Sequence, residues 1–312
     1  MKIFVAGASG ALGQQLIPML ADRGHRVVGM TRTPAKTALV RELGAEPVLA
    51  DGLDATAVGA AIRAAEPEIV VHQMTALATI DMRHVDRSFA ATNKLRTVGA
   101  DLLLAAAREV GARRFVAQSY AGWPYARIGG PVKTEEDPLD PNPPDGYRET
   151  LDAIKYLEAT VTGSTAPAGV VLRYGGFYGP NTSVSADGEI VEAVRKRRLP
   201  VVGGGGGVWS FVHIQDAAAA TVAAIEQAEP GLYNIVDDDP APVSAWLPAL
   251  AEAAGAKPPM RVPAWIGRLA AGPAATTIMT EGRGASNAKA RKDLDWVLRY
   301  PSWRQGFRSL FT

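Results

Sequence analysis

The stretch Val5-Ala6-Gly7-Ala8-Ser9-Gly10-Ala11-Leu12-Gly13 decides the fold of this chain. It follows the short apolar run Ile3–Ala6 and opens a helical pattern over Gly10–Arg23. Glycine lets a backbone turn tightly and approach a ligand, and the helix then offers free N–H groups and a positive dipole end. The spacing is G-x-x-G-x-x-G, so an ordinary strand–helix turn is the alternative. Because strand, turn and helix agree, we predict a dinucleotide site made by Gly7, Ser9, Gly10, Ala11, Leu12 and Gly13.

Beyond this turn, short β-branched runs alternate with Ala/Leu-rich helical stretches. The predicted strands are Ile3–Ala6, Val27–Met30, Pro47–Leu49, Ile69–His72, Phe115–Gln118 and Val170–Leu172. The predicted helices are Gly10–Arg23, Pro34–Leu43, Asp54–Ala65, Ser88–Val110 and Tyr147–Thr162. Strands that are apolar throughout are typical of parallel sheets covered on both faces. The alternation predicts an α/β fold, a Rossmann-type doubly wound parallel sheet over residues 1–173, to which 211–236 return. Residues 174–312 are expected to form mostly a smaller C-terminal substrate-binding domain.

Composition and charge exclude several classes of function. The chain has 312 residues, a formal net charge of +1 and no cysteine. Disulfides, thiolate metal sites and a cysteine nucleophile are therefore excluded, and the four histidines have no metal-ligand spacing, so no metal is expected. The near-neutral charge gives no reason to expect nucleic acid, and no apolar run is long enough for a membrane span. We expect a cytoplasmic protein with a small-molecule substrate.

The end of the second predicted strand indicates which dinucleotide is bound. An acidic residue there would accept a hydrogen bond from the ribose 2′-hydroxyl of NAD. This chain instead has Thr31, Arg32 and Lys36. A guanidinium, an ammonium group and a hydroxyl suit a 2′-phosphate, which favours NADP(H) over NAD. The alternative is a solvated basic helix start.

Later motifs resemble the extended short-chain dehydrogenase/reductase family, also called the NAD-dependent epimerase/dehydratase family. They are Asp51-Gly52-Leu53-Asp54, Val70-Val71-His72-Gln73-Met74-Thr75-Ala76, Leu172-Arg173-Tyr174-Gly175-Gly176-Phe177-Tyr178-Gly179-Pro180 and Phe211-Val212-His213-Ile214-Gln215-Asp216-Ala217. The resemblance implies cofactor contacts from Asp51, Gly52, Met74, Thr75, Ala76, Asn93, Gln118, Tyr174 and Gly175. It also implies a homodimer that pairs the helices Ser88–Val110 and Tyr147–Thr162.

The chain departs from this family where proton transfer takes place. The family's Tyr-x-x-x-Lys pair lies on one helix face, where the ammonium lowers the pKa of the phenol. When the helix is aligned on Glu158, Thr150 and Ile154 stand at the Tyr and Lys positions. Tyr147 and Lys155 share a face but are two turns apart, too far for the usual relay. We therefore expect no conventional Tyr/Lys mechanism.

The end of the fifth predicted strand offers substitute groups. Ser119 keeps the first hydroxyl of the family's Ser/Thr pair, and Tyr120 takes the second position. Ser119 is predicted to position substrate, and Tyr120 or Tyr147 to manage the proton. The alternative for Tyr120 is packing beneath the Pro-rich loop Lys133–Gly146.

The expected substrate side also departs from the family. Trp209-Ser210 stands where sugar-nucleotide enzymes carry an arginine, and Gly176 stands where many carry an asparagine. These departures predict an NADP(H)-dependent oxidoreductase acting on a small substrate that is not a nucleotide sugar. Two other readings stay open: an epimerase, dehydratase or lyase with tightly held cofactor, and a non-catalytic NADP-sensing protein.

Overall fold

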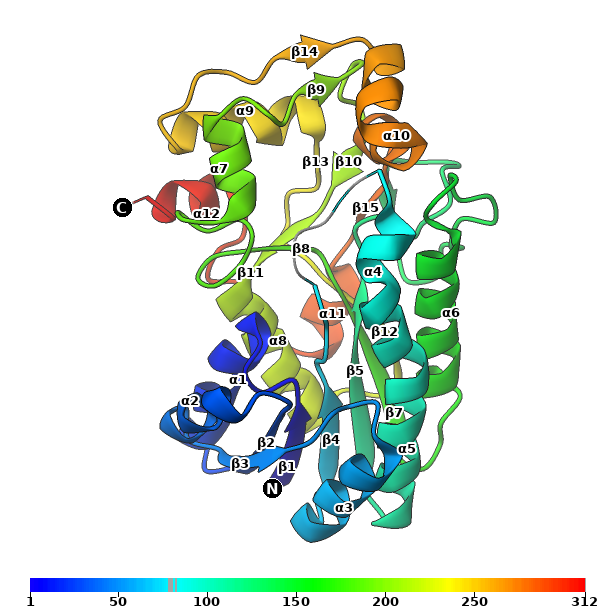
Figure 1. Cartoon of the computed structure of the whole chain (residues 1–312), viewed down its shortest axis with the longest axis vertical. Coiled ribbons are helices and arrows are strands. Elements are labelled where there is room, and N and C mark those ends of the chain that lie inside the picture. The colour runs from blue at the N-terminus through cyan, green and yellow to red at the C-terminus, as the bar shows by residue number, and fades with distance from the viewer. Residues whose placement is uncertain (78–80, 82, 312) are drawn as a thin grey trace.

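Seven parallel strands form the central sheet of the computed structural model, which describes residues 1–77, 81 and 83–311 (Figure 1). Its strands are β1 (Lys2–Ala6), β2 (Arg26–Thr31), β3 (Glu46–Leu49), β4 (Ile69–His72), β5 (Arg114–Tyr120), β7 (Ala168–Tyr174) and β12 (Gly231–Ile235). The spatial order is β12-β7-β5-β4-β1-β2-β3, so the direction of winding reverses between β1 and β4. Ligands of such sheets bind outside the carboxyl ends of the strands at this reversal. The prediction of a doubly wound parallel sheet is confirmed.

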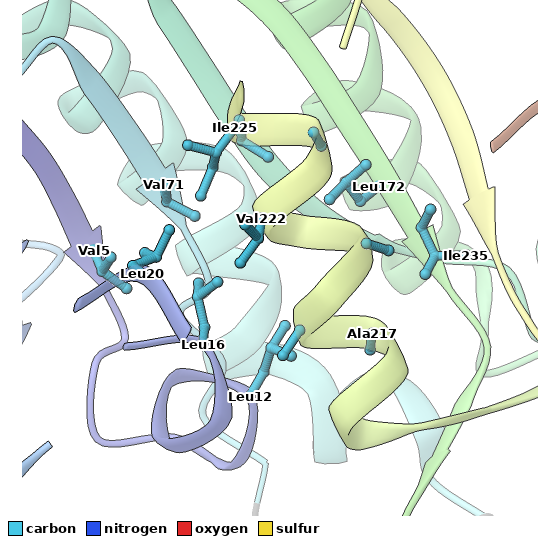
Figure 2. Close-up of a cluster of buried hydrophobic side chains, with 14 of the residues drawn as sticks. Val5, Leu12, Leu16, Leu20, Val71, Leu172, Ala217, Val222, Ile225 and Ile235 are labelled. Atoms are coloured by element: carbon cyan, nitrogen blue, oxygen red, sulfur yellow. The ribbon is translucent and has the colours of Figure 1, made fainter. Parts of the chain in front are cut away.

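Helices cover both faces of the sheet. One face carries α1 (Ala11–Asp22), η1 (Pro34–Lys36), α2 (Thr37–Glu42), α8 (Ile214–Gln227) and α11 (Ala288–Asp293). The other carries α3 (Ala55–Ala65), α5 (Ala100–Glu109) and α6 (Arg148–Thr162). Figure 2 shows Leu16 and Leu20 of α1 packed against Val222 and Ile225 of α8 over the sheet. This apolar contact fixes the glycine turn before α1 relative to the strand ends.

The long predicted helix Ser88–Val110 is a continuous helical run of three segments. These are α4 (Val85–Lys94), the π-helical segment η2 (Leu95–Gly99) and α5. The run begins three residues earlier than predicted and carries a π segment in its middle, which no pattern in the sequence signals. Such segments widen a helix by one residue per turn and occur often at functional sites.

A second cluster of elements lies beyond the carboxyl ends of the strands (Figure 1). Its helices are α7 (Glu189–Arg195), α9 (Val243–Ala253), α10 (Ala264–Glu281) and α12 (Trp303–Ser309). Its short strands are β6 (Val132–Lys133), β8 (Gly176–Tyr178), β9 (Val201–Val202), β10 (Val208–Trp209), β11 (Phe211–His213), β13 (Ala241–Pro242), β14 (Arg261–Val262) and β15 (Gly284–Ala285). Trp246 and Trp303 are buried in its core, while residues 214–235 return to the main sheet as α8 and β12. Within the described part of the chain, no helix has the length and apolar character needed to cross a bilayer.

Candidate active site

The glycine turn between β1 and α1 has a backbone that only glycine fits at two positions. Gly7 has a φ of +98°, and a Cβ there would lie 2.6 Å from the carbonyl oxygen of Gln73. A Cβ on Gly13 would lie 2.4 Å from the carbonyl oxygen of Ala8. Gly10 is exposed and precedes α1 without any side-chain cap, so the first-turn N–H groups have no side-chain acceptor. This cradle suits a pyrophosphate, because backbone donors and the helix dipole both point outward.

The end of β2 lies directly beside this turn. The Oγ atoms of Ser9 and Thr31 are 3.0 Å apart, and Thr31 Oγ1 also accepts from the N–H of Thr33. Arg32 and Lys36 are exposed, and neither forms an ion pair with any residue that the structure describes. Two uncompensated cations therefore stand where the 2′ position of an adenosine ribose is expected.

The strand β4 ends at a histidine that fixes the neighbouring backbone. Buried His72 places Nε2 3.0 Å from the carbonyl oxygen of Leu95, and its Nδ1 accepts from the N–H of Met74. Burial lowers the pKa of His72 to about 4, so the ring is neutral and donates through Nε2. Met74 in turn covers Gly52, where a Cβ would lie 2.4 Å from the Met74 sulfur. His72 thus links β4 to the π segment η2.

Four predicted cofactor residues lie around this bend at the surface. Asp51 is exposed and accepts from the N–H of Leu53, while Thr75 is exposed after β4. The N–H of Ala76 donates to Thr92 Oγ1 of α4 at 3.0 Å. Asn93, one residue further, donates to Thr150 Oγ1 on α6 at 3.2 Å. The segment after β4 is therefore fastened to the helices of the far face.

The hydroxyl of Ser119 faces a buried ion pair. Ser119 Oγ donates to Glu158 Oε1 at 2.7 Å. Arg173 holds the same carboxylate with two hydrogen bonds, from Nε to Oε1 at 2.7 Å and from Nη2 to Oε2 at 2.6 Å. Burial lowers the pKa of Arg173, but the bonded Glu158 carboxylate more than offsets this and the net shift is upward. Ser119 therefore lies at the edge of a network that joins β5, α6 and β7.

This network continues to Tyr125, between β5 and the Pro-rich loop. Tyr125 accepts from Arg173 Nη1 at 3.2 Å and donates to Asn234 Oδ1 at 2.5 Å. Burial raises the pKa of Tyr125 to about 12. Tyr125 is therefore a neutral donor that connects the network to β12.

The α6 positions that the sequence alignment on Glu158 predicts for the family's Tyr and Lys are Thr150 and Ile154. Thr150 Oγ1 donates to Asp86 Oδ1 at 2.7 Å, and Ile154 is buried. Lys155 Nζ donates to the backbone oxygen of Asp140 at 3.3 Å, in the Pro-rich loop. Tyr147 is the N-cap residue of α6. No ammonium group thus bonds the Tyr147 phenol among the interactions of the described residues.

Tyr120 and Tyr147 both lie against Trp123 in an aromatic cluster. The ring centroids of Tyr120 and Trp123 are 5.2 Å apart and those of Trp123 and Tyr147 5.9 Å apart, both edge-to-face. Phe89 of α4 completes the cluster, with its centroid 6.2 Å from that of Trp123. Burial raises the pKa of both phenols well above the ordinary value, and a nearby Arg96 guanidinium opposes the rise. Tyr147 Oη and Trp123 Nε1 are buried and have no hydrogen-bond partner in the part of the chain that the structure describes.

The remaining predicted residues lie where β5 and β7 end. Tyr174 points to the α8 side, where its hydroxyl is 2.7 Å from Thr221 Oγ1 and accepts from Gln73 Nε2 at 3.2 Å. The N–H of Gly175 donates to the oxygen of Ile235 at 3.1 Å. Gln118 is half-buried on β5, in register with Leu172 of β7. The Tyr174 phenol is therefore bonded within the core between the sheet and α8.

A model of the NAD dependent epimerase/dehydratase family matches residues 3–236. The chain belongs to this family. Solved structures of the epimerase/dehydratase family share the fold across the chain. A UDP-glucose 4-epimerase of Thermotoga maritima aligns with a TM-score of 0.79 at 20% identity, covering 100% of this chain and 97% of the other. A human epimerase family protein solved with NADPH aligns with a TM-score of 0.77 at 17% identity, covering 100% and 99%.

Several curated relatives of the chain are named as reductases, and another is named a UDP-glucose 4-epimerase. A 3-diazoavenalumate denitrifying reductase of a Streptomyces species is 43% identical, over 98% of this chain and 99% of the relative. A 2-alkyl-3-oxoalkanoate reductase of Stenotrophomonas maltophilia is 28% identical, over 82% and 76%. The chain is accordingly an NAD(P)-dependent oxidoreductase of this family.

Sequence reasoning missed Arg96 and the bonded state of Ser119. Arg96 follows Asn93 by three residues, a spacing that puts both side chains on one helix face. This spacing is the feature of the sequence that could have pointed to Arg96. The Glu158 partner of Ser119 comes from a helix 39 residues away, so no local pattern marks it.

Proposed function

We propose that the chain is an NADP(H)-dependent reductase whose small organic substrate accepts hydride without a protein proton donor. The observation that carries this proposal is the α6 face itself. Thr150 is bonded to Asp86 and Ile154 is buried, which supports the prediction that these two positions stand in place of the family's acid and its ammonium partner. A reductase built this way is best matched to a substrate whose reduction needs no proton.

The preference for NADP(H) rests on Arg32 and Lys36. Both are exposed beside the Ser9–Thr31 contact, and neither is paired with an acidic residue among those described. Guanidinium and ammonium groups at this point attract a 2′-phosphate and give the 2′-hydroxyl of NAD no acceptor. The proposed cofactor contacts are Gly7, Ser9, Gly10, Ala11, Leu12, Gly13, Thr31, Arg32, Lys36, Asp51, Gly52, Met74, Thr75, Ala76, Asn93, Gln118, Tyr174 and Gly175.

The chemistry of the acceptor separates two substrate classes. When bound, the reduced cofactor supplies two electrons and one hydrogen as hydride. A ketone that accepts hydride becomes an alkoxide and must then take a proton. An aryl diazonium cation that accepts hydride gives a neutral arene and N2, so charge and atoms balance without any proton. The name of the Streptomyces relative describes a reductase that removes nitrogen from a diazo compound. We propose an aryl diazonium substrate for this chain.

The aromatic cluster suits such a substrate in two ways. Tyr120, Tyr147 and Trp123 bring three rings together at the carboxyl end of β5, where they can pack against the aryl ring of the substrate. The cluster is also poor in water, since Tyr147 has only 2% of its surface exposed. Exclusion of water would suppress hydrolysis of the diazonium group to a phenol.

Ketone reduction is the second candidate, because two relatives are named for it. One is the Stenotrophomonas protein, and the other is a farnesyl-dihydroquinoline-oxide ketoreductase of Stigmatella aurantiaca, 27% identical over 82% of this chain and 74% of the relative. In that case Ser119 would position the carbonyl, and Tyr120 or Tyr147 would donate the proton.

The two candidates are separated by Tyr120→Phe and Tyr147→Phe, assayed with an aryl diazonium salt and with a panel of ketones. Diazonium reduction is expected to stay within about threefold of wild type, because no phenolic proton is transferred. Loss of a general acid would instead cost on the order of 10²–10⁴-fold in ketone reduction. Ketone turnover that falls in this way, with no diazonium turnover, would establish the second candidate. A cofactor that stays bound through dialysis and shows no net oxidation would favour an epimerase or lyase. A protein that binds the cofactor but turns over neither substrate would favour a sensor.

We also propose a homodimer through α4, η2, α5 and α6. Val98 and Tyr156 on these helices are 49% and 43% exposed, which gives the surface large apolar groups to bury. Sedimentation equilibrium should give twice the chain mass, and Val98→Glu should give a monomer. A wild-type protein that sediments as a monomer at micromolar concentration would reject this dimer.

A further inference from the structure

Arg96 lies in the π segment η2 and points into the interior between α4, α6 and the end of β5. Only 7% of its surface is exposed, although the side chain carries a permanent charge. Its guanidinium carbon lies 5.7 Å from the Phe89 ring centroid, and it interacts electrostatically with the phenols of Tyr120 and Tyr147. Arg96 therefore belongs to the aromatic cluster.

The charge of Arg96 has no anionic partner among the described residues. Its hydrogen bond goes to Asn93 Oδ1 at 3.3 Å, a neutral acceptor. No carboxylate of a described residue lies within 4.0 Å, and residues 78–80 and 82, which the structure leaves undescribed, are Ala, Thr, Ile and Met. Burial without a counterion accordingly lowers the pKa of Arg96.

The carboxylates nearest to this region already serve other groups. Glu158 is held by Arg173 and Ser119, and Asp86 accepts from the N–H and hydroxyl of Thr150. Neither forms an ion pair with Arg96, although the charge of Glu158 acts on the guanidinium from beyond contact distance. A buried cation of this kind is costly in a folded protein unless an anion joins it.

Two further polar atoms of the same cluster lack partners among the described residues. Tyr147 Oη and Trp123 Nε1 are buried donors that no acceptor of these residues reaches, and Trp123 packs between Tyr120 and Tyr147. Three donors, one of them charged, thus lie together among the aromatic rings of the cluster. Only an acceptor-rich, negatively charged group with an aromatic body would satisfy all of them at once.

We propose that Arg96 binds the carboxylate of an aromatic acid whose ring enters the cluster of Phe89, Tyr120, Trp123 and Tyr147. The planar guanidinium can hold a carboxylate with two parallel hydrogen bonds, and Tyr147 and Trp123 can donate to the same ligand. The inference rests on the proposed function only in identifying this acid with the substrate of the reductase. It makes Arg96 the residue that selects aromatic carboxylates over neutral aromatic compounds.

Binding of cinnamate and of its neutral isostere cinnamamide to the NADP⁺-loaded protein tests the proposal by calorimetry. Wild type is expected to bind cinnamate at least tenfold more tightly than cinnamamide. Arg96→Met should weaken cinnamate binding by about 10- to 100-fold, the loss expected for a charged hydrogen-bonding partner, and change cinnamamide binding less than threefold. Arg96→Lys should recover part of the loss. The exposed Arg87 of α4 provides the control Arg87→Met, which should bind both ligands as wild type does.

Two further measurements distinguish ligand binding by Arg96 from a purely structural role: the melting temperature and the affinity for NADP⁺, both of which would change if Arg96 only stabilised the fold. The ligand-free Arg96→Met protein should melt at the wild-type temperature or above it, because the variant removes a buried unpaired charge. Its affinity for NADP⁺ should be unchanged. The proposal would be overturned if wild type bound cinnamate and cinnamamide equally, or if Arg96→Met bound NADP⁺ more weakly than wild type. It would also be overturned if Arg96→Met melted at a lower temperature and still preferred cinnamate as wild type does. Because no turnover is measured, a failure here is separate from a failure of diazonium reduction.

Discussion

The buried ion pair of Glu158 and Arg173 should be one of the most sensitive points of the sheet–helix interface. The side chains are 6% and 3% exposed, and their oxygen and nitrogen atoms approach to 2.6 Å. Glu158→Ala leaves the Arg173 guanidinium buried without its anion. Breaking a buried pair from one side costs about 3–5 kcal/mol, a large part of the roughly 5–15 kcal/mol that keeps a domain folded.

An exposed pair of the same length provides the matched control. Glu192 and Lys196 of α7 also approach to 2.6 Å, but their side chains are 49% and 52% exposed. Water and salt screen this pair, so Glu192→Ala should cost less than about 1 kcal/mol. The contrast sets a buried, multiply bonded pair against an exposed single contact of the same length.

Urea unfolding followed by tryptophan fluorescence measures both free energies. The double variant Glu158→Met/Arg173→Met removes both charges and fills much of the same volume. It should recover most of the stability lost in Glu158→Ala, since no buried charge remains. Equal losses for Glu158→Ala and Glu192→Ala, or a double variant less stable than Glu158→Ala, would refute the reasoning.

Three further predictions concern cofactor selection, the glycine turn and pH. Arg32→Asp should lower the NADPH-to-NADH preference, measured as a ratio of kcat/KM, by at least about tenfold, because it removes a charge-assisted phosphate contact; an unchanged ratio would contradict the assigned role. Gly13→Ala should lower the free energy of unfolding in urea by about 1–3 kcal/mol and weaken NADPH binding, since its Cβ would lie 2.4 Å from a carbonyl oxygen. A variant with the wild-type stability and the wild-type affinity for NADPH would contradict this prediction. Burial raises the pKa of Asp237 to about 8. Between about pH 4 and 8 the folded state therefore keeps a proton that the unfolded state releases. Over this range the free energy of unfolding should fall with rising pH, by up to about 1.4 kcal/mol per pH unit. Asp237→Asn lacks this group, so the difference in unfolding free energy between wild type and variant should change with pH by that slope between about pH 4 and 8. Parallel pH curves for the two proteins would show that Asp237 makes no such contribution.

The sequence was most informative where local geometry dictates residue type. Gly7 has a positive φ, and Gly13 meets a carbonyl oxygen, so the spacing of the turn follows from its own backbone. The apolar strands likewise predicted a parallel sheet, because a strand covered on both faces has no polar side. Neither feature depends on distant parts of the chain.

The catalytic region was less predictable because its contacts come from distant segments. The Ser119 hydroxyl meets Glu158 of α6, and the Tyr174 hydroxyl meets Thr221 of α8. Arg96 reads from the sequence as one more basic residue on a helix, and only the π segment and the packing of α4 against α6 turn it inward. The tertiary fold therefore decides which of these side chains form hydrogen bonds within the protein, and the local sequence does not.

The most direct test of a reductase that needs no protein acid is the stoichiometry of diazonium reduction. Isotopically labelled para-carboxybenzenediazonium and NADPH would be mixed with the protein, and both NADPH oxidation and labelled N2 release would be measured against a protein-free control. We predict one N2 and one benzoate per NADPH oxidised, at a rate above the control that Tyr120→Phe and Tyr147→Phe leave within about threefold. NADPH oxidation without N2 release, or turnover that collapses in either phenylalanine variant, would contradict the central claim.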